Sequence, residues 1–142
     1  MGRLFRWFSR PLLALQDSEK AHSRSLLLLR LASSNPVFRG MLRFVFKPKS
    51  SLKLQCFGMT YSHPFGLAAG MDKRAEALRG WESIGLAFSE IGGVTMLEQA
   101  GNPKPRMFRH GGDRALINRM GFNNPGSEKI VERLKRSQQR LI

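Results

Sequence analysis

The sequence predicts an α/β fold that follows an N-terminal helical region. Residues 1–46 place apolar side chains at helical spacing, and helix-starting and helix-breaking residues separate the runs. From residue 47 on, short apolar runs flank one helical run, which is the order of a βαβ unit. Such a unit indicates a parallel sheet with a crossover helix. The predicted organisation is a helical region over 1–46 and the start of a sheet-containing domain over 47–142.

The N-terminal region is predicted to be a series of short helices. Pro11 suits the first turn of one helix, because its φ is already helical and it has no N–H to leave unpaired. Asp17 or Ser18 can cap a second helix that runs to about residue 32. A Ser-Ser-Asn-Pro run ends that helix, and residues 37–46 form the next one.

The segment that follows is predicted to contain short strands and one helix. Residues 52–62 form two strands that turn near Gly58, and residues 66–70 form a buried strand of small residues. Residues 74–85 form the crossover helix and residues 88–95 the next strand. The last two strands would be the parallel pair of the βαβ unit.

The last third of the chain is predicted to be a long loop and a helix. Residues 96–118 hold several Gly and Pro residues and are expected to be irregular, and loops of this length usually carry function. Ser127 can cap a basic helix over 127–141. The expected buried face of that helix contains Ile130, Val131 and Leu134.

Charge is the unusual feature of the composition. The 142 residues carry 24 Lys and Arg against 10 Asp and Glu, a formal net charge of +14. Residues 1–50 hold ten of the basic residues and two of the acidic ones, so the N-terminal third is the more basic part. This balance favours anionic partners: nucleic acid, phosphate-bearing cofactors or acidic lipid surfaces. Cys56 is the only cysteine, which excludes an intrachain disulfide and fits a reducing compartment.

Small residues followed by a lysine indicate a possible ligand site. Ala68, Ala69 and Gly70 carry almost no side chain, so the backbone there can approach a flat ring system closely. In a barrel, the loops that follow the strands build the active site, and Asp72 and Lys73 follow this strand. A lysine there supplies positive charge for an anionic ring or a carboxylate. Taken alone, the same small residues are also typical of a tightly packed core strand.

Three ordered blocks of sequence resemble one enzyme family. They are residues 17–22 (DSEKAH), residues 63–73 (HPFGLAAGMDK), and residues 101–109 with 116–124 (GNPKPRMFR and LINRMGFNN). These blocks resemble the class 2, quinone-dependent dihydroorotate dehydrogenases, and the similarity extends over nearly the whole chain. The resemblance implies a TIM (β/α)8 barrel, of which this chain holds the N-terminal part. It also implies that a small helical membrane-associated region precedes the barrel.

The resemblance further implies an FMN cofactor and the residues near each ligand. The implied FMN-binding residues are Ala69, Gly70, Met71, Asp72, Lys73 and Gly93. The residues implied to bind dihydroorotate or orotate are Lys73, Asn118, Arg119, Met120, Gly121 and Phe122. His22 and Arg109 match positions beside the quinone tunnel, and the alternatives are a solvated helix histidine and a surface charge. The amides of Asn118 and Asn123 suit a pyrimidine edge, but both residues are also typical of turns.

The chain departs from the family pattern at several positions. His63 stands where the family usually has Asn, Gly93 where it has Thr, and Met96 where it has Pro. The serine that serves as the class 2 catalytic base would lie beyond residue 142, so no catalytic residue is assigned, and none is assigned to a metal. The isolated 142 residues are therefore not expected to catalyse the reaction.

The implied function is oxidation of dihydroorotate to orotate, with electrons passed to ubiquinone or menaquinone, in de novo pyrimidine synthesis. The implied location is the cytoplasmic face of a bacterial inner membrane, with the mitochondrial inner membrane as the alternative. Three rivals stay open: a basic nucleic-acid-binding module, a membrane-surface protein without catalysis, and a soluble class 1 dihydroorotate dehydrogenase. The first has only net charge in its favour, and the N-terminal helices argue against the last.

Overall fold

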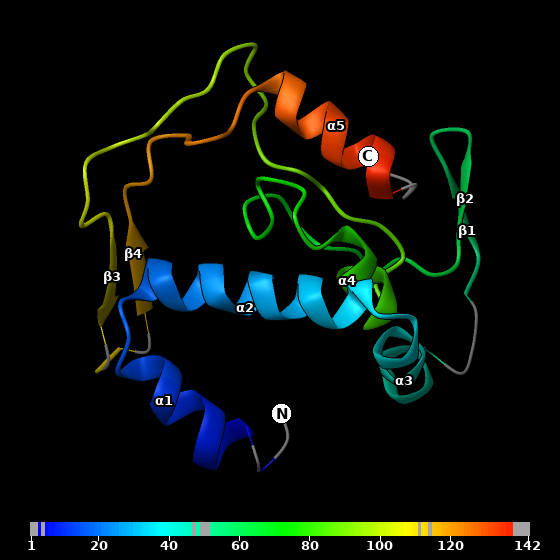
Figure 1. Cartoon of the computed structure of the whole chain (residues 1–142), viewed down its shortest axis with the longest axis horizontal. Helices are drawn as coiled ribbons and strands as arrows, with labels where there is room; N and C mark the ends of the chain where they lie inside the picture. Colours follow the sequence, from blue (N-terminus) through cyan, green and yellow to red (C-terminus); the bar gives the residue numbers. More distant parts are fainter. Residues whose placement is uncertain are drawn as a thin grey trace.

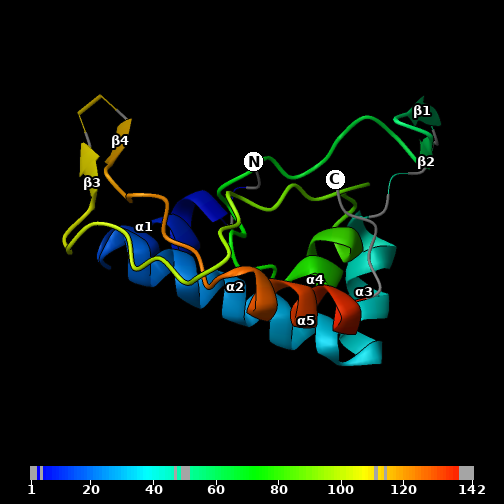
Figure 2. The same ribbon diagram turned by 90° about the horizontal axis from the view of Figure 1, so that it is seen from above.

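The computed structural model of the chain describes residues 3, 5–46, 48, 52–110, 112–113 and 115–137 (Figure 1). The elements in chain order are a π-helical turn η1 (Phe5–Ser9), α1 (Arg10–Ala14), α2 (Ser18–Ser34), α3 (Pro36–Phe46), β1 (Leu54–Cys56), β2 (Met59–Tyr61), α4 (Leu78–Ser83), β3 (Met107–His110), β4 (Ala115–Asn118) and α5 (Ser127–Ser137). Helices α2 to α5 lie together on one side of the molecule, and the two β-hairpins stand at its opposite ends (Figure 2). The long helix α2 runs across the middle and contacts α1, α3 and α4.

The predicted N-terminal helices are confirmed over the described residues. Pro11 lies in the first turn of α1. The backbone N–H of Lys20 donates to Asp17 Oδ1 at 3.0 Å, so Asp17 is the cap of α2. At the other end, the side-chain oxygen of Asn35 accepts from Val37 N at 2.9 Å and starts α3. Local capping chemistry therefore sets the boundaries of α2.

The predicted hairpin over 52–62 is also confirmed. Strands β1 and β2 pair antiparallel, and Gly58 makes the turn with a φ of +72°. The ring of Tyr61 meets that of Phe88 edge-on, with 5.4 Å between the centroids. This contact connects the hairpin to the second parallel segment of the chain.

The predicted βαβ unit is present in a reduced form. Leu67 and Ser89 form a single parallel bridge, flanked by two backbone hydrogen bonds of 2.8 and 2.9 Å, and α4 lies between them in the chain. The α/β order and the parallel direction are therefore confirmed. The full strands predicted over 66–70 and 88–95 are wrong, and the two alanines of the first are exposed rather than buried. Within the described residues no third strand pairs with either segment. The remainder of a barrel stays a prediction.

The segment over 96–118 was expected to be irregular, and its second half is instead a hairpin. Strands β3 and β4 pair antiparallel in a four-residue register, from Met107 opposite Asn118 to His110 opposite Ala115. The prediction was wrong because Gly and Pro are frequent on both sides of these short strands, and such residues indicate a loop. The two strands nevertheless pair, and the pairing gives their backbone N–H and C=O groups hydrogen-bond partners.

Helix α5 is confirmed over Ser127–Ser137, and its predicted continuation to 141 lies outside the described residues. Ile130 is buried and Leu134 half-buried, as expected, but Val131 is 46% exposed, so its predicted burial is wrong. The guanidinium of Arg79, in α4, donates to the carbonyls of the last two residues of α5. These bonds hold the end of α5 against α4.

Helix α4 also packs against α2 and α3. These contacts join the two predicted regions on either side of residue 47, and the domain boundary there stays a prediction. The contact with α2 depends on Gly80. A Cβ added there would lie 2.9 Å from Leu29 Cδ1, so the missing side chain allows the two helices to approach.

Gly80→Ala is expected to lower the free energy of unfolding by about 1–2 kcal/mol. Displacing Leu29 costs about 1–3 kcal/mol, and the better helix propensity of alanine offsets up to about 1 kcal/mol. Gly40→Ala in α3 is the matched control, because a Cβ there meets nothing within 4 Å. It should stabilise by about 0.5–1 kcal/mol. Urea unfolding of both variants measures the difference, and equal effects would contradict the packing role of Gly80.

Candidate functional site

A cavity of about 350 Å³ lies where the two parallel segments end. Its lining residues come from three parts of the chain: Ala69, Gly70 and Lys73; Gly92 and Gly93; and Asn118, Met120, Gly121, Phe122 and Asn123. The first two parts follow the bridged residues, and the third begins at the last residue of β4. The cavity therefore stands at the carboxyl end of the parallel pair, where α/β folds usually bind ligands.

The cavity brings together most of the residues that the sequence predicted for the cofactor and the substrate. From the predicted FMN set it contains Ala69, Gly70, Lys73 and Gly93, and from the substrate set Lys73, Asn118, Met120, Gly121 and Phe122. Met71, Asp72 and Arg119 do not line it. The position of these residues is thus defined, while the role of each stays a prediction.

Lys73 is the charged group of the cavity wall. Its Nζ donates to Asn123 Oδ1 at 3.2 Å, and its stem packs beside Gly92, where an added Cβ would lie 3.2 Å from Lys73 Cγ. Partial burial lowers the pKa of the Lys73 ammonium below its ordinary value, the charge of Arg106 lowers it further, and Glu19 opposes this. Lys73 is therefore a partly desolvated cation at the cavity.

Asp72, next to it, has a structural role. Its side chain is 1% exposed. Its carboxylate accepts from Glu76 N at 2.8 Å, Ala77 N at 2.8 Å and Trp81 Nε1 at 3.2 Å. These bonds fix the turn that leads into α4. The carboxylate is thus directed to the protein interior rather than to the predicted FMN contact, and it holds the backbone from which Lys73 extends.

Asn124 anchors the end of the third lining segment, residues 118–123. No role was assigned to it from the sequence. Its side chain is buried, and Oδ1 accepts from Thr95 Oγ1 and from Gly126 N, each at 3.0 Å. Its backbone pairs with Gln99 in both directions at 3.0 Å. Phe122, two residues earlier, is 83% exposed beside the cavity. The Asn-Pro-Gly sequence that follows a glycine turn was the available signal.

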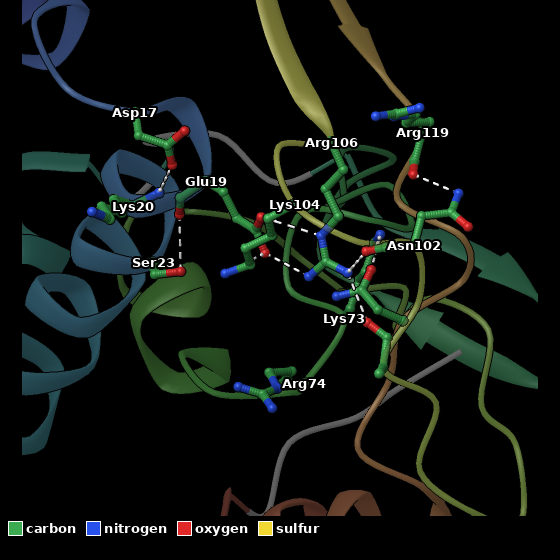
Figure 3. Close-up of polar contacts among 12 residues, drawn as sticks. Asp17, Glu19, Lys20, Ser23, Lys73, Arg74, Asn102, Lys104, Arg106 and Arg119 are labelled. Atoms are coloured by element: carbon green, nitrogen blue, oxygen red, sulfur yellow. Dashed lines mark hydrogen bonds and ion pairs between the residues drawn. The ribbon is translucent and has the colours of Figure 1, made fainter.

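A buried ion pair lies behind this loop and was also missed (Figure 3). Arg106 is 7% exposed. It donates to the Glu19 carboxylate from Nη2 at 2.6 Å and from Nε at 3.2 Å. Lys104 Nζ lies 3.4 Å from the same carboxylate. The hydrogen bond from Arg106 is the main cause that lowers the pKa of Glu19, and burial opposes it. Glu19 belongs to α2, so the pair joins the N-terminal helices to the cavity loops.

The two residues predicted for the quinone tunnel lie at the N-terminal helices. Arg109, in β3, donates from Nη1 to the carbonyls of Leu13, Ala14 and Gln16 at 2.9 to 3.3 Å. It therefore caps the end of α1, and it is not an isolated surface charge. His22 is half-buried on α2. A tunnel role for either residue stays a prediction.

The cavity walls fit a flat ring system, as the predicted FMN requires. Gly70 has a φ of +98°, and a Cβ added there would meet only Lys73 Cε, at 4.0 Å. A Cβ at Gly93 would meet nothing within 4 Å. The backbone of both segments is therefore bare beside the cavity, and the Thr that the family usually has at Gly93 would also find space.

Comparisons of sequence and of structure both find dihydroorotate dehydrogenases. The family model for dihydroorotate dehydrogenase matches residues 51–142. The "Dihydroorotate dehydrogenase (quinone)" of Thermus thermophilus is 50% identical over 125 residues, which are 87% of this chain and 36% of that protein. The protein of the same name from Gloeobacter violaceus is 46% identical over 127 residues, 89% of this chain and 36% of that protein. The chain thus spans about a third of the length of these curated relatives.

The solved structure of ligand-free DHODH from Eimeria tenella superposes with a TM-score of 0.67 at 36% identity, covering 85% of this chain and 32% of that one. Its complex with ferulenol gives a TM-score of 0.64 at 36% identity and covers 84% of this chain and 30% of that one. Sequence match, fold and cavity agree, and this chain belongs to the dihydroorotate dehydrogenase family.

Proposed function

We propose that the complete protein is a quinone-dependent dihydroorotate dehydrogenase, which oxidises dihydroorotate to orotate in pyrimidine synthesis. The observation that carries this proposal is the convergence of Lys73, two glycine-containing segments and the loop over 118–123 on one cavity. The names of the relatives support the quinone as the final electron acceptor. A serine outside residues 1–142, expected from the family pattern, would take the proton.

In this proposal FMN, when bound, supplies the acceptor for the hydride that leaves dihydroorotate. Ala69, Gly70 and Gly93 would lie along its ring system, because they place almost no side chain in the way. Lys73 Nζ would keep positive charge beside both the ring and the substrate carboxylate. That charge is more effective in a partly desolvated cavity than in water.

The amides of the loop are suited to the substrate's ring edge. Asn123 Oδ1 already accepts from Lys73 Nζ, so the Nδ2 group of Asn123 is left to donate to a carbonyl oxygen of the pyrimidine. Asn118, at the end of β4, offers a second amide on the same wall. Phe122 is the exposed apolar residue beside them and would cover the bound ring.

The test joins residues 1–142 to the part of the Thermus thermophilus relative that the sequence match leaves uncovered. We expect the purified chimera to carry flavin absorbance and to form orotate from dihydroorotate when a soluble quinone is supplied. The unmodified Thermus protein is the positive control. A folded chimera that binds flavin but forms no orotate, beside an active control, would overturn the proposed function.

We further propose that the N-terminal helices bind an anionic membrane surface, on the cytoplasmic face of a bacterial inner membrane. Along α3 the exposed large apolar residues are Val37, Phe38, Met41, Phe44, Val45 and Phe46. Along η1 and α1 they are Trp7, Phe8 and Leu12, and Leu15 follows directly after α1. Such faces, with basic residues near them, are typical of helices that lie in the lipid interface. Among the described residues, none of the helices has the length and apolarity needed to cross a bilayer. Membrane binding without catalysis is the second candidate function.

Phe44→Ser is expected to weaken binding of the full chain to anionic vesicles about tenfold or more, because burying one such ring contributes about 1.5–3 kcal/mol. Phe44 is 92% exposed in α3, and the control Phe57→Ser removes a ring that is 82% exposed at the turn of the β1–β2 hairpin. Added salt should release part of the protein, since ions screen the lipid attraction. Cosedimentation measures both effects. Equal, salt-insensitive binding to neutral vesicles would contradict the electrostatic part.

A further inference from the structure

Arg106 connects two loops of the cavity region with α2. Besides the two bonds to Glu19, its Nη1 donates to the carbonyl oxygens of Ala100 at 2.7 Å and Asn102 at 3.1 Å. All three guanidinium nitrogens therefore have acceptors. A buried guanidinium is costly unless it is paired in this way, so its position is narrowly fixed.

The loop that Arg106 organises is joined directly to the cavity wall. Asn102 donates from its backbone N–H to Met120 O at 3.1 Å and from Nδ2 to Arg119 O at 2.8 Å. Arg119 N donates in turn to Arg106 O at 2.9 Å. Two glycines allow this approach: a Cβ at Gly101 would clash with Met120 O, and a Cβ at Gly121 would lie 2.7 Å from Asn102 N, which shows that the backbones are in close contact. A shift of Arg106 would therefore move Met120 and the residues that follow it.

Glu19 has a second effect, through charge. Arg106 and Glu19 are the charged groups whose fields act on Lys73, with opposite sign. Removing the Glu19 carboxylate would leave the Arg106 charge uncompensated near the Lys73 ammonium. The same carboxylate thus holds the loop in place and limits repulsion between two cations.

We propose that Glu19 and Arg106 are a positioning pair for the cavity, through which helix α2 fixes the wall formed by residues 120–123. The proposal rests on the proposed function, in which this wall meets the substrate. Glu19 does not line the cavity, so it holds the wall in place through its contact with Arg106. The N-terminal helices are thereby part of the architecture of the site as well as a lipid-facing region.

The test uses Glu19→Gln in the full chain, with Glu98→Gln as the matched control. Glu98 also forms an ion pair, at 2.6 Å with Lys129, but its side chain is 52% exposed. We measure hydrogen exchange at the amides of Asn102 and Arg119, and at those of Glu76 and Ala77 as an internal reference. In Glu19→Gln, exchange at the first two should become roughly tenfold faster, because a charge-assisted contact that restrains their loop is lost. The reference amides, which Asp72 binds, should not change.

The second measurement is the rate at which Lys73 is acylated as a function of pH. The pKa of Lys73 should fall further in Glu19→Gln, so its neutral amine should react faster at a given pH than in the unsubstituted chain. Arg106→Lys keeps the positive charge but loses the two-nitrogen contact of the guanidinium with Glu19. It should leave the acylation rate of Lys73 much closer to that of the unsubstituted chain, while exchange at Asn102 and Arg119 becomes faster.

Unchanged exchange at Asn102 and Arg119 in Glu19→Gln would overturn the proposal. Equal acceleration at Glu76 and Ala77 would overturn it too, because it would show general loss of structure. Neither measurement needs flavin, dihydroorotate or turnover. An inactive chimera combined with the expected exchange pattern would therefore refute the proposed function and not the positioning pair.

Discussion

Lys73→Ala is expected to slow single-turnover orotate formation by the chimera roughly 30- to 1000-fold, which corresponds to about 2–4 kcal/mol of lost transition-state stabilisation. Lys73 is the partly desolvated cation of the cavity. In the proposed reaction, both the substrate carboxylate and the charge that develops during oxidation are negative. A charge-assisted contact in such a place is worth roughly twice a neutral hydrogen bond. Without the ammonium, none of the side chains described as lining the cavity carries a charge that compensates the negative groups.

Asn123→Ala is the matched comparison for Lys73→Ala. Asn123 lines the same cavity and is hydrogen-bonded to Lys73, but it offers only neutral contacts that water can partly replace. We expect a loss of about 1–2 kcal/mol for this variant. Rapid-quench measurement of orotate at saturating dihydroorotate gives both rates. If Lys73→Ala forms orotate at nearly the unsubstituted rate, the electrostatic role of Lys73 is refuted.

Asp72→Ala should cause the largest loss of stability, about 3–5 kcal/mol in the free energy of unfolding. Three donors lose their acceptor at once, and each donor left buried without a partner costs about 1–3 kcal/mol. The two backbone donors lie in the turn before α4, so the contact of α4 with α2 is weakened as well. Urea unfolding of the full chain measures the change.

Two controls separate the Asp72 network from a general effect of removing a carboxylate. Asp72→Asn keeps one acceptor oxygen and should cost about 1–2 kcal/mol. Asp113→Ala removes a side chain that is 79% exposed and pairs with His110 at 3.0 Å. Such exposed pairs contribute about 0–1 kcal/mol, so little change is expected. A loss in Asp113→Ala as large as that in Asp72→Ala would contradict the assigned network.

The features predicted correctly from the sequence are those that depend on neighbouring residues. The Asp17 cap needs only a backbone N–H three residues away, and the turn at Gly58 needs only a residue that tolerates positive φ. The strand over 66–70 failed because its burial depends on other strands, which local pattern does not reveal. The β3–β4 hairpin had a usable signal, since Gly112-Asp113 lies between two short runs with β-forming residues.

The candidate site was predicted through the resemblance, whereas its supporting contacts were not. Lys73 and Asn123 are 50 residues apart, and spacing alone gives no reason to place them together. Glu19 had a sufficient local explanation, because an acid in the first turn of a helix suits the helix dipole. Arg106 lies within the block over 101–109 that carried the resemblance, but the resemblance gave it no role and no partner. A pair of that kind becomes visible only when the fold brings its two halves into contact.

The Glu19–Arg106 pair also sets an order of events during synthesis. Its members are 87 residues apart, so Glu19 is synthesised about 4–17 s before Arg106 at ordinary elongation rates. During that interval the Glu19 carboxylate lacks the guanidinium that will hold it, and the apolar faces of α1 and α3 are complete before Arg106 is added. We therefore expect the N-terminal helices of a nascent chain to meet a lipid surface first, and the cavity wall to close onto them afterwards.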